Sequence, residues 1–196
     1  MDDLAIAQQV LAGDTQAFEH LVHRHKDHVA RIVAGKVPAQ AAEEVAQDAF
    51  VRAFTSLSSW RSDAPFQHWL ARITVRACHD YWRREYRNRE TPASALGEVG
   101  RDWLAGVESG GDFSGRPIND LDAYEAKQVL DWALDRLSPS DRMVLTLTYL
   151  EEKSVRETAE LMGITRANVK VRAHRARRKL AVLLREQGAG EDCHEE

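Results

Sequence analysis

Basic side chains are concentrated in one segment near the C-terminus. Residues 165–185 contain eight arginines and lysines and no acidic residue. A helix face that simply meets solvent usually mixes both signs of charge, whereas a one-sign cluster suits a phosphate backbone. The net charge of −4 for the whole chain hides this segregation, because residues 121–160 are predominantly acidic. The segment is therefore predicted to contact nucleic acid.

The residues around this segment have the spacing of a helix-turn-helix. Ser154 and Glu157 have the spacing of a capping box, in which each side chain binds the backbone N–H of the other residue. Gly163 can take the left-handed conformation that ends a helix, and Thr165 can cap the next one. Two helices joined by a short turn that contains glycine form the skeleton of a helix-turn-helix.

The second helix of this motif separates an apolar stripe from a basic face. The stripe consists of Val169, Ala173, Ala176, Leu180 and Leu183. The predicted base contacts on the opposite side are Lys170, Val171, His174 and Arg175. We predict that three arginines position the helix on the DNA backbone: Arg166, Arg172 and Arg178. The predicted DNA-binding residues of the first helix are Ser154 and Arg156. The alternative is a helical hairpin that only packs against the rest of the chain, which would not explain the acid-free face.

Histidines and cysteines are the other side chains that could do chemistry. One predicted helix carries His20, His23, His25 and His28, and an acidic tail carries Cys193 and His194. A zinc site needs about four convergent ligands, and the four histidines are distributed around much of their helix. We therefore expect solvated histidines and no metal or cofactor, with any sensing role left open. The two cysteines, Cys78 and Cys193, predict no disulfide framework.

The elements that must position these residues are all helical. Apolar residues recur with helical spacing from Phe18 to Val33, from Ala41 to Phe54 and from Pro65 to Tyr81, and again after residue 121. No alternating run predicts a strand. The expected fold class is all-α, with two small helical domains joined by a flexible linker, and with the helix-turn-helix in the second domain.

The stretch between the two periodic halves has the composition of a linker. Residues 91–120 contain six of the eleven glycines of the chain, together with two prolines. We therefore predict domains at 1–90 and 121–187, a linker at 91–120 and an acidic tail at 188–196. The chain opens with Met-Asp-Asp and shows no secretory signal and no apolar run of membrane-spanning length, so a cytoplasmic location is expected.

Three ordered motifs resemble the sigma-70 family of bacterial RNA polymerase sigma factors. The run from Glu43 to Phe54 resembles region 2.2 of these proteins, and the run from Trp60 to Ile73 is similar to regions 2.3 and 2.4 of the extracytoplasmic function (ECF) group. The segment from Asp131 to Leu184 is similar to region 4 of the same group. The short plan, without the intervening domain of housekeeping sigma factors, also resembles this group.

The resemblance implies a polymerase contact in the first domain. In the family, the region 2.2 helix docks on the clamp helices of the largest subunit of core RNA polymerase. The matching residues here are Glu43, Glu44, Gln47, Asp48 and Phe50. In isolation, such a polar patch would be an ordinary solvated face.

The resemblance also implies contacts with the promoter −10 element. In the family, the loop before region 2.4 captures a flipped base, and the matching residues are Trp60, Arg61, Ser62 and Asp63. Trp60 could instead be a core anchor at a helix end. Further −10 contacts are implied for Arg76, Arg83 and Arg84. Arg76 stands where asparagine is familiar in the family, which leaves the preferred −10 sequence open.

The function implied by these motifs is that of an alternative sigma factor and not of an enzyme. Such a protein binds core RNA polymerase, recognises the −35 and −10 elements of a promoter, and is commonly held by a membrane-anchored anti-sigma factor. The main alternative is a conventional two-domain regulator, whose first domain senses a ligand or dimerises and which binds duplex DNA by itself.

Overall fold

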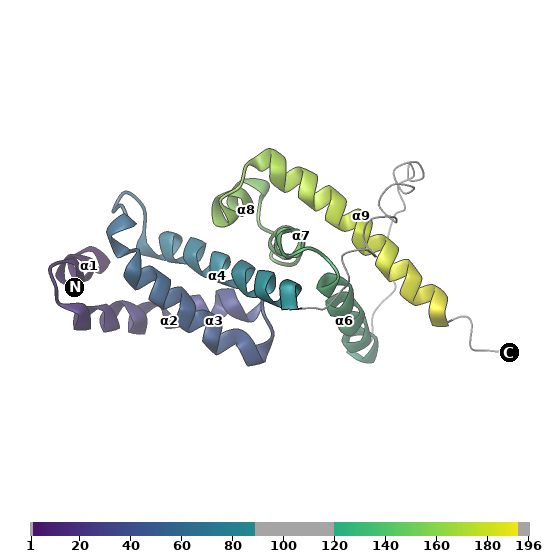
Figure 1. Cartoon of the computed structure of the whole chain (residues 1–196), viewed down its shortest axis with the longest axis horizontal. Helices are drawn as coiled ribbons and strands as arrows, with labels where there is room; N and C mark the ends of the chain where they lie inside the picture. The colour runs from purple at the N-terminus through teal and green to yellow at the C-terminus, as the bar shows by residue number, and fades with distance from the viewer. Residues whose placement is uncertain (1, 89–119, 192–196) are drawn as a thin grey trace.

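The computed structural model describes residues 2–88 and 120–191, and the side chains of 2–88 and 127–184 (Figure 1). The first range folds into α1 (Asp3–Leu11), α2 (Phe18–Ala34), α3 (Ala39–Thr55) and α4 (Phe66–Asn88), with 3-10 turns at Thr15–Ala17 and Leu57–Ser59. The second range folds into α6 (Asp120–Asp135), α7 (Pro139–Leu145), the π-helix η5 (Thr146–Leu150), α8 (Val155–Met162) and α9 (Arg166–Glu191). No strand occurs in these two ranges, and the all-α prediction is confirmed.

The N-terminal helices differ from the prediction at their first elements. Helix α1 was not predicted, and it is capped by Asp2, whose carboxylate accepts from Ala5 N at 2.8 Å. Asp14 caps the 3-10 turn that precedes α2, and its carboxylate accepts from Ala17 N at 3.3 Å. The chain therefore enters α2 through a short turn of its own.

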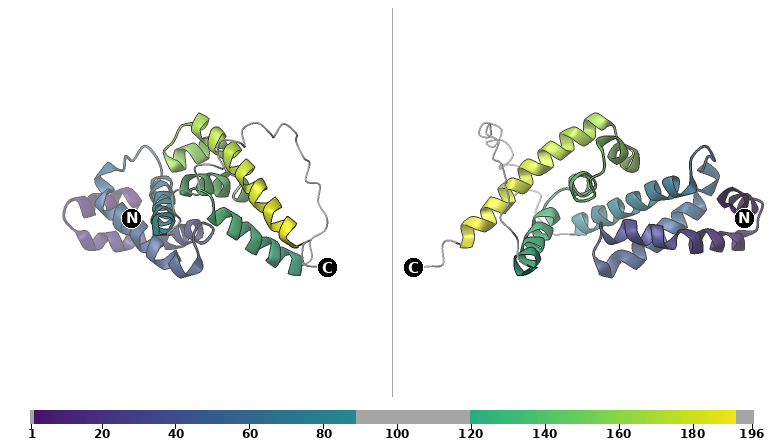
Figure 2. Two further views of the ribbon diagram at one scale, coloured as in Figure 1. Left: turned by 45° about the vertical axis from the view of Figure 1, so that its right-hand side comes forward. Right: turned by 180° about the vertical axis from the view of Figure 1, so that it is seen from behind.

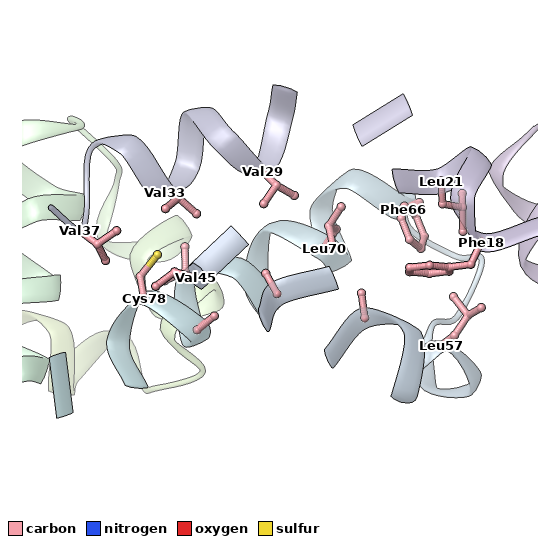
Figure 3. Packing of buried hydrophobic residues seen from close by; sticks show 14 of the residues in the cluster. Phe18, Leu21, Val29, Val33, Val37, Val45, Leu57, Phe66, Leu70 and Cys78 are labelled. Atoms are coloured by element: carbon pink, nitrogen blue, oxygen red, sulfur yellow. The ribbon is translucent and has the colours of Figure 1, made fainter. Parts of the chain in front are cut away.

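Helix α3 presents its smallest residues to the core. Its buried positions are Ala41, Val45, Ala49 and Ala53, spaced by four residues. A stripe of small side chains lets the neighbouring helices α2 and α4 approach closely, and both pack against α3. Figure 3 shows the resulting core, with Phe18, Leu21, Leu57 and Phe66 at one end and Val33, Val37, Val45 and Cys78 at the other.

The predicted helix-turn-helix is present with its caps. Ser154 Oγ accepts from Glu157 N at 3.2 Å, and a carboxylate oxygen of Glu157 accepts from Ser154 N at 2.9 Å, which completes the capping box. Gly163 has φ of +68°, the left-handed conformation that glycine adopts without strain. Thr165 Oγ1 accepts from Asn168 N at 3.2 Å at the start of α9.

The two predicted domains pack against each other, which the sequence did not indicate. Helix α4 contacts both α7 and α8, and two views in Figure 2 show α7 beside the C-terminal half of α4. The predicted linker at 91–120 lies outside the described residues except for Asp120. The acidic tail was predicted from residue 188, but α9 continues to Glu191, and residues 192–196 are outside the described residues.

Candidate nucleic-acid interface

The N-terminal half of α9 presents the predicted recognition face to solvent. Lys170, His174 and Arg175 are exposed, and Val171 has 49% of its surface accessible. On the opposite side, Val169 is fully buried against the short helices before it, together with Val144, Ala159 and Ala173. Burial of one side therefore fixes the rotation of α9 and turns these four side chains outward together.

The three arginines predicted to contact the DNA backbone differ in their exposure to solvent. Arg166 is exposed, whereas Arg172 is half-buried and its guanidinium lies 3.0 Å from the Asp141 carboxylate of α7. Arg178 is also half-buried. Of the three, only Arg166 is fully open to a DNA backbone, and Arg172 is held in position by its ion pair with Asp141.

The first helix of the motif uses its predicted DNA-contact residues partly for its own structure. The Ser154 hydroxyl donates to Glu157 at 2.6 Å, and this hydrogen bond lowers the pKa of the Glu157 carboxyl. Arg156 pairs with Glu160 at 2.9 Å, one helical turn on. Both residues are exposed, so they remain accessible to a duplex laid across the start of α8.

Helix α4 carries the predicted −10 contacts in two groups. Arg83 and Arg84 lie near its C-terminus and are exposed, with Arg84 Nη2 at 3.2 Å from Glu44 of α3. Arg76 lies near the middle of α4, where its side chain faces the turn that follows α8. A Cβ atom built on Gly163 would be 2.7 Å from Arg76 Nη2, so the arginine rests directly against that turn.

In the loop before α4, Trp60 packs against the protein, whereas the three polar residues that follow it are exposed. The Trp60 ring packs edge-on against Phe66 with centroids 5.1 Å apart, and its indole N–H donates to Ala64 O at 3.1 Å. These contacts favour the core-anchor interpretation of Trp60. Arg61, Ser62 and Asp63 are exposed at the tip of the loop.

Three of the five residues of the predicted polymerase patch on α3 are exposed. Glu43, Glu44 and Gln47 are exposed, and Asp48 pairs with Arg52 at 2.8 Å. Phe50 was included in the patch, yet it is half-buried and packs against the core.

Val51 is an exposed apolar side chain of α3 that was not predicted to belong to this patch, with 60% of its surface accessible. It lies off the buried stripe of every fourth residue, and that offset was a signal in the sequence that could have identified it.

The histidines of α2 have separate environments. His25 is buried and contacts Asp3 at 3.0 Å, while His23 contacts Glu19 at 3.3 Å. Burial, together with Arg31, lowers the pKa of His28. Within residues 2–88 and 127–184, no group of three or more potential ligands gathers, and Cys193 and His194 lie outside the described residues. None of the described helices combines the length and apolar character that a membrane crossing requires.

Comparison with known proteins connects both halves of the chain to one family. The family model for sigma-70 region 2 matches residues 21–88, and the model for sigma-70 region 4 matches residues 127–180. The ECF RNA polymerase sigma-E factor of Escherichia coli K12 is 31% identical over 179 residues, which cover 90% of this chain and 91% of that protein. The chain belongs to the ECF group of RNA polymerase sigma factors.

Two solved structures have a similar fold. The structure of CnrH in complex with the cytosolic domain of CnrY is 28% identical and covers 94% of this chain and 97% of that one, with a TM-score of 0.51. The sigma factor RpoE in complex with the anti-sigma factor NepR from Bartonella quintana shares the fold, with 20% identity, coverage of 86% and 96%, and a TM-score of 0.50.

Membership in the ECF group decides whether the helix-turn-helix belongs to a sigma factor or to a conventional two-domain regulator. A sigma factor directs promoter-specific initiation of transcription, which a conventional two-domain regulator does not do. The region 2 match runs from Leu21 in α2 to the end of α4, and the region 4 match runs from Lys127 in α6 to Leu180 in α9. The exposed faces described above therefore lie in the two parts of the chain that define the family.

Proposed function

We propose that this sigma factor divides its work among three helices. Helix α3 docks on the clamp helices of core RNA polymerase, α4 and the loop before it bind the −10 element, and α9 reads the −35 element. This division assigns the domain at 1–90 to polymerase and −10 binding and the domain at 121–187 to −35 binding.

The observation that carries the proposal is the exposed face of α9. A helix that enters the major groove needs side chains at its N-terminal end for base edges and flanking bases for phosphates. Lys170, Val171, His174 and Arg175 share one exposed face, and Arg166 stands at its edge. The segment around them contains no acid that would repel DNA.

Charge and exposure support the other two contacts. The acidic patch of α3 suits a basic partner surface, with Val51 as an apolar contact beside it. The exposed Arg61, Ser62 and Asp63 provide polar partners for an unstacked base. In this proposal the energy for opening DNA comes from binding the unstacked strand, and the protein carries no catalytic step or cofactor of its own.

An anti-sigma factor is the proposed inhibitor. The similar RpoE structure contains one, and here a groove of about 580 Å³ lies between the two domains. One wall carries basic groups such as Arg31 and Arg72, and the other carries acidic groups such as Glu157 and Glu160. A membrane-anchored partner reaching into this groove would act in the cytoplasm, where RNA polymerase works.

Run-off transcription with core RNA polymerase tests the proposal. Arg175→Ala should lower −35-dependent run-off by about tenfold or more, the cost of losing a base contact, and leave binding to core polymerase unchanged. Lys127→Ala, which removes an exposed positive charge of α6 outside the helix-turn-helix, is the matched control. Loss of polymerase binding in Arg175→Ala, or no run-off from any genomic template with the wild-type protein, would contradict the proposal.

A further inference from the structure

Helix α1 lies outside the part of the chain that matches the sigma-70 region 2 model. That match begins at residue 21, whereas α1 covers Asp3–Leu11. Three apolar side chains of α1 are buried in the N-terminal core, namely Ile6, Ala7 and Val10. Helix α1 also packs against the 3-10 turn Leu57–Ser59, which leads directly into the loop proposed to bind the −10 element. The helix is therefore placed to influence the conformation of that loop.

A buried histidine joins α1 to α2. The His25 side chain is 2% exposed, and its Nε2 lies 3.0 Å from Asp3 Oδ2, at hydrogen-bond distance. Within the described residues, the Nδ1 atom of His25 has no hydrogen-bond partner. The Asp3 carboxylate is therefore the polar contact that fixes the imidazole ring. Removing that carboxylate would leave a second buried nitrogen of the ring without a partner, which is unfavourable.

The imidazole ring is the first of three rings in contact that end at the loop. His25 lies against Phe66 at the start of α4, with ring centroids 5.1 Å apart. Phe66 is buried and packs edge-on against Trp60, again with centroids 5.1 Å apart. Contacts between aromatic rings depend on their relative orientation, and a close-packed interior transmits small displacements. A shift of His25 would therefore be passed to Phe66 and then to Trp60.

Trp60 and Ala64 enclose the exposed tip of the loop. The indole N–H of Trp60 donates to Ala64 O at 3.1 Å, across the tip residues Arg61, Ser62 and Asp63. The orientation of the Trp60 ring therefore sets the position at which the loop closes. An unstacked base is bound by polar groups in a pocket of fixed shape, so a loop with a displaced end would lose part of that contact.

We propose that Asp3 and His25 are positioning residues for −10 recognition. They act through the rings of Phe66 and Trp60 on the exposed tip of the loop before α4, and neither residue touches DNA. Their contribution is preorganisation, because a loop already held in its binding conformation loses less conformational freedom when it binds. This inference rests on the −10 contact proposed above, and it adds α1 to the elements that −10 binding requires.

Binding of the −10 strand by the holoenzyme tests this role. The full chain is assembled with core RNA polymerase, and the probe is the single-stranded −10 segment of a promoter from which the wild type gives run-off. Asp3→Ala should weaken binding of this strand by at least about fivefold, the loss expected when one base contact is impaired. Binding of a duplex that carries only the −35 element of the same promoter should stay unchanged. Asp3→Asn keeps a hydrogen-bonding group beside His25 and should restore binding of the strand.

Two further variants separate positioning from loss of stability. His25→Leu removes the ring without leaving a buried polar group unpaired, and it should weaken binding of the −10 strand as much as Asp3→Ala does. Val45→Ala truncates a buried residue at the end of the same core that is remote from Phe66 (Figure 3). Measured well below its Tm, Val45→Ala should bind the strand as the wild type does. An equal loss in Val45→Ala would refute the positioning role.

The remaining outcomes are equally decisive. Wild-type binding of the −10 strand by Asp3→Ala or by His25→Leu would overturn the positioning role, as would a loss that Asp3→Asn does not reverse. A matching loss of −35 binding would show a general defect and would also overturn it. If the wild-type holoenzyme does not distinguish the −10 strand from a scrambled strand of the same composition, the −10 contact itself is refuted, and the positioning role fails with it.

Discussion

At the scale of single residues, Val171 is the apolar member of the exposed recognition face. Its neighbours on that face are cationic or imidazole side chains, whereas Val171 offers two methyl groups and has half its surface accessible. In the major groove, the thymine C5-methyl group is the feature of a base pair that an apolar side chain can recognise. We therefore expect Val171 to select thymine within the −35 element.

Replacing thymine by uracil, which lacks that methyl group, measures this selection. The thymines of the −35 element are replaced one at a time. One of these replacements should weaken binding of the polymerase holoenzyme by about 1 kcal/mol, near the low end for a base contact. Val171→Ser should bind the thymine and uracil duplexes equally. If the wild type is insensitive to every uracil replacement, Val171 does not contact thymine.

At the scale of elements, local rules located the helix-turn-helix correctly. Ser154, Glu157, Gly163 and Thr165 act through partners within five residues, so their types and spacing were sufficient to predict the caps and the turn. The same rules did not detect α1, whose apolar residues Ile6, Ala7 and Val10 cover barely two turns. Short helices depend on packing for their stability, which a local pattern does not contain.

The capping box of α8 can be tested by removing one hydroxyl. Ser154→Ala should lower the free energy of unfolding by about 1 kcal/mol, because the Glu157 backbone N–H loses its acceptor. In a chain of this size that corresponds to a Tm lower by roughly 2–4 °C in calorimetry. Ser154→Thr keeps the hydroxyl and is the matched control.

DNA affinity distinguishes the two roles of Ser154. If the residue acts by fixing the start of α8, Ser154→Thr should restore both Tm and −35 affinity. A variant Ser154→Ala with wild-type Tm would contradict the capping role, and restored Tm without restored DNA affinity would indicate a direct contact that threonine cannot make.

At the scale of the whole molecule, the sequence predicted two domains but not their association. The ammonium of Lys36, in the N-terminal domain, forms an ion pair with the carboxylate of Glu151, in the C-terminal domain. The two residues are 115 positions apart, and no helical or capping rule relates residues at that separation. Lysine is almost never fully buried without a partner, so its position in the sequence predicts a solvated side chain. The same reasoning applies to Arg76, whose guanidinium lies against the turn at Gly163, 87 positions later in the chain.

Three consecutive residues of α7 show how the domains are joined. Met143 faces the N-terminal core, Val144 packs with α8 and α9, and Leu145 packs with α6 and α9. All three are buried. One short helix therefore belongs to both domains, and heat should unfold them in a single transition, because neither core is complete without α7.

Truncation of these neighbouring side chains tests the coupling by calorimetry. Met143→Ala should cost about 2–5 kcal/mol, and because the lost contacts lie between the domains, it should split the melt into two transitions. Val144→Ala leaves the N-terminal core intact, so it should lower the Tm and keep one transition. Two transitions in the wild type would mean that the domains unfold independently, and a single transition in Met143→Ala would mean that α7 does not carry the coupling.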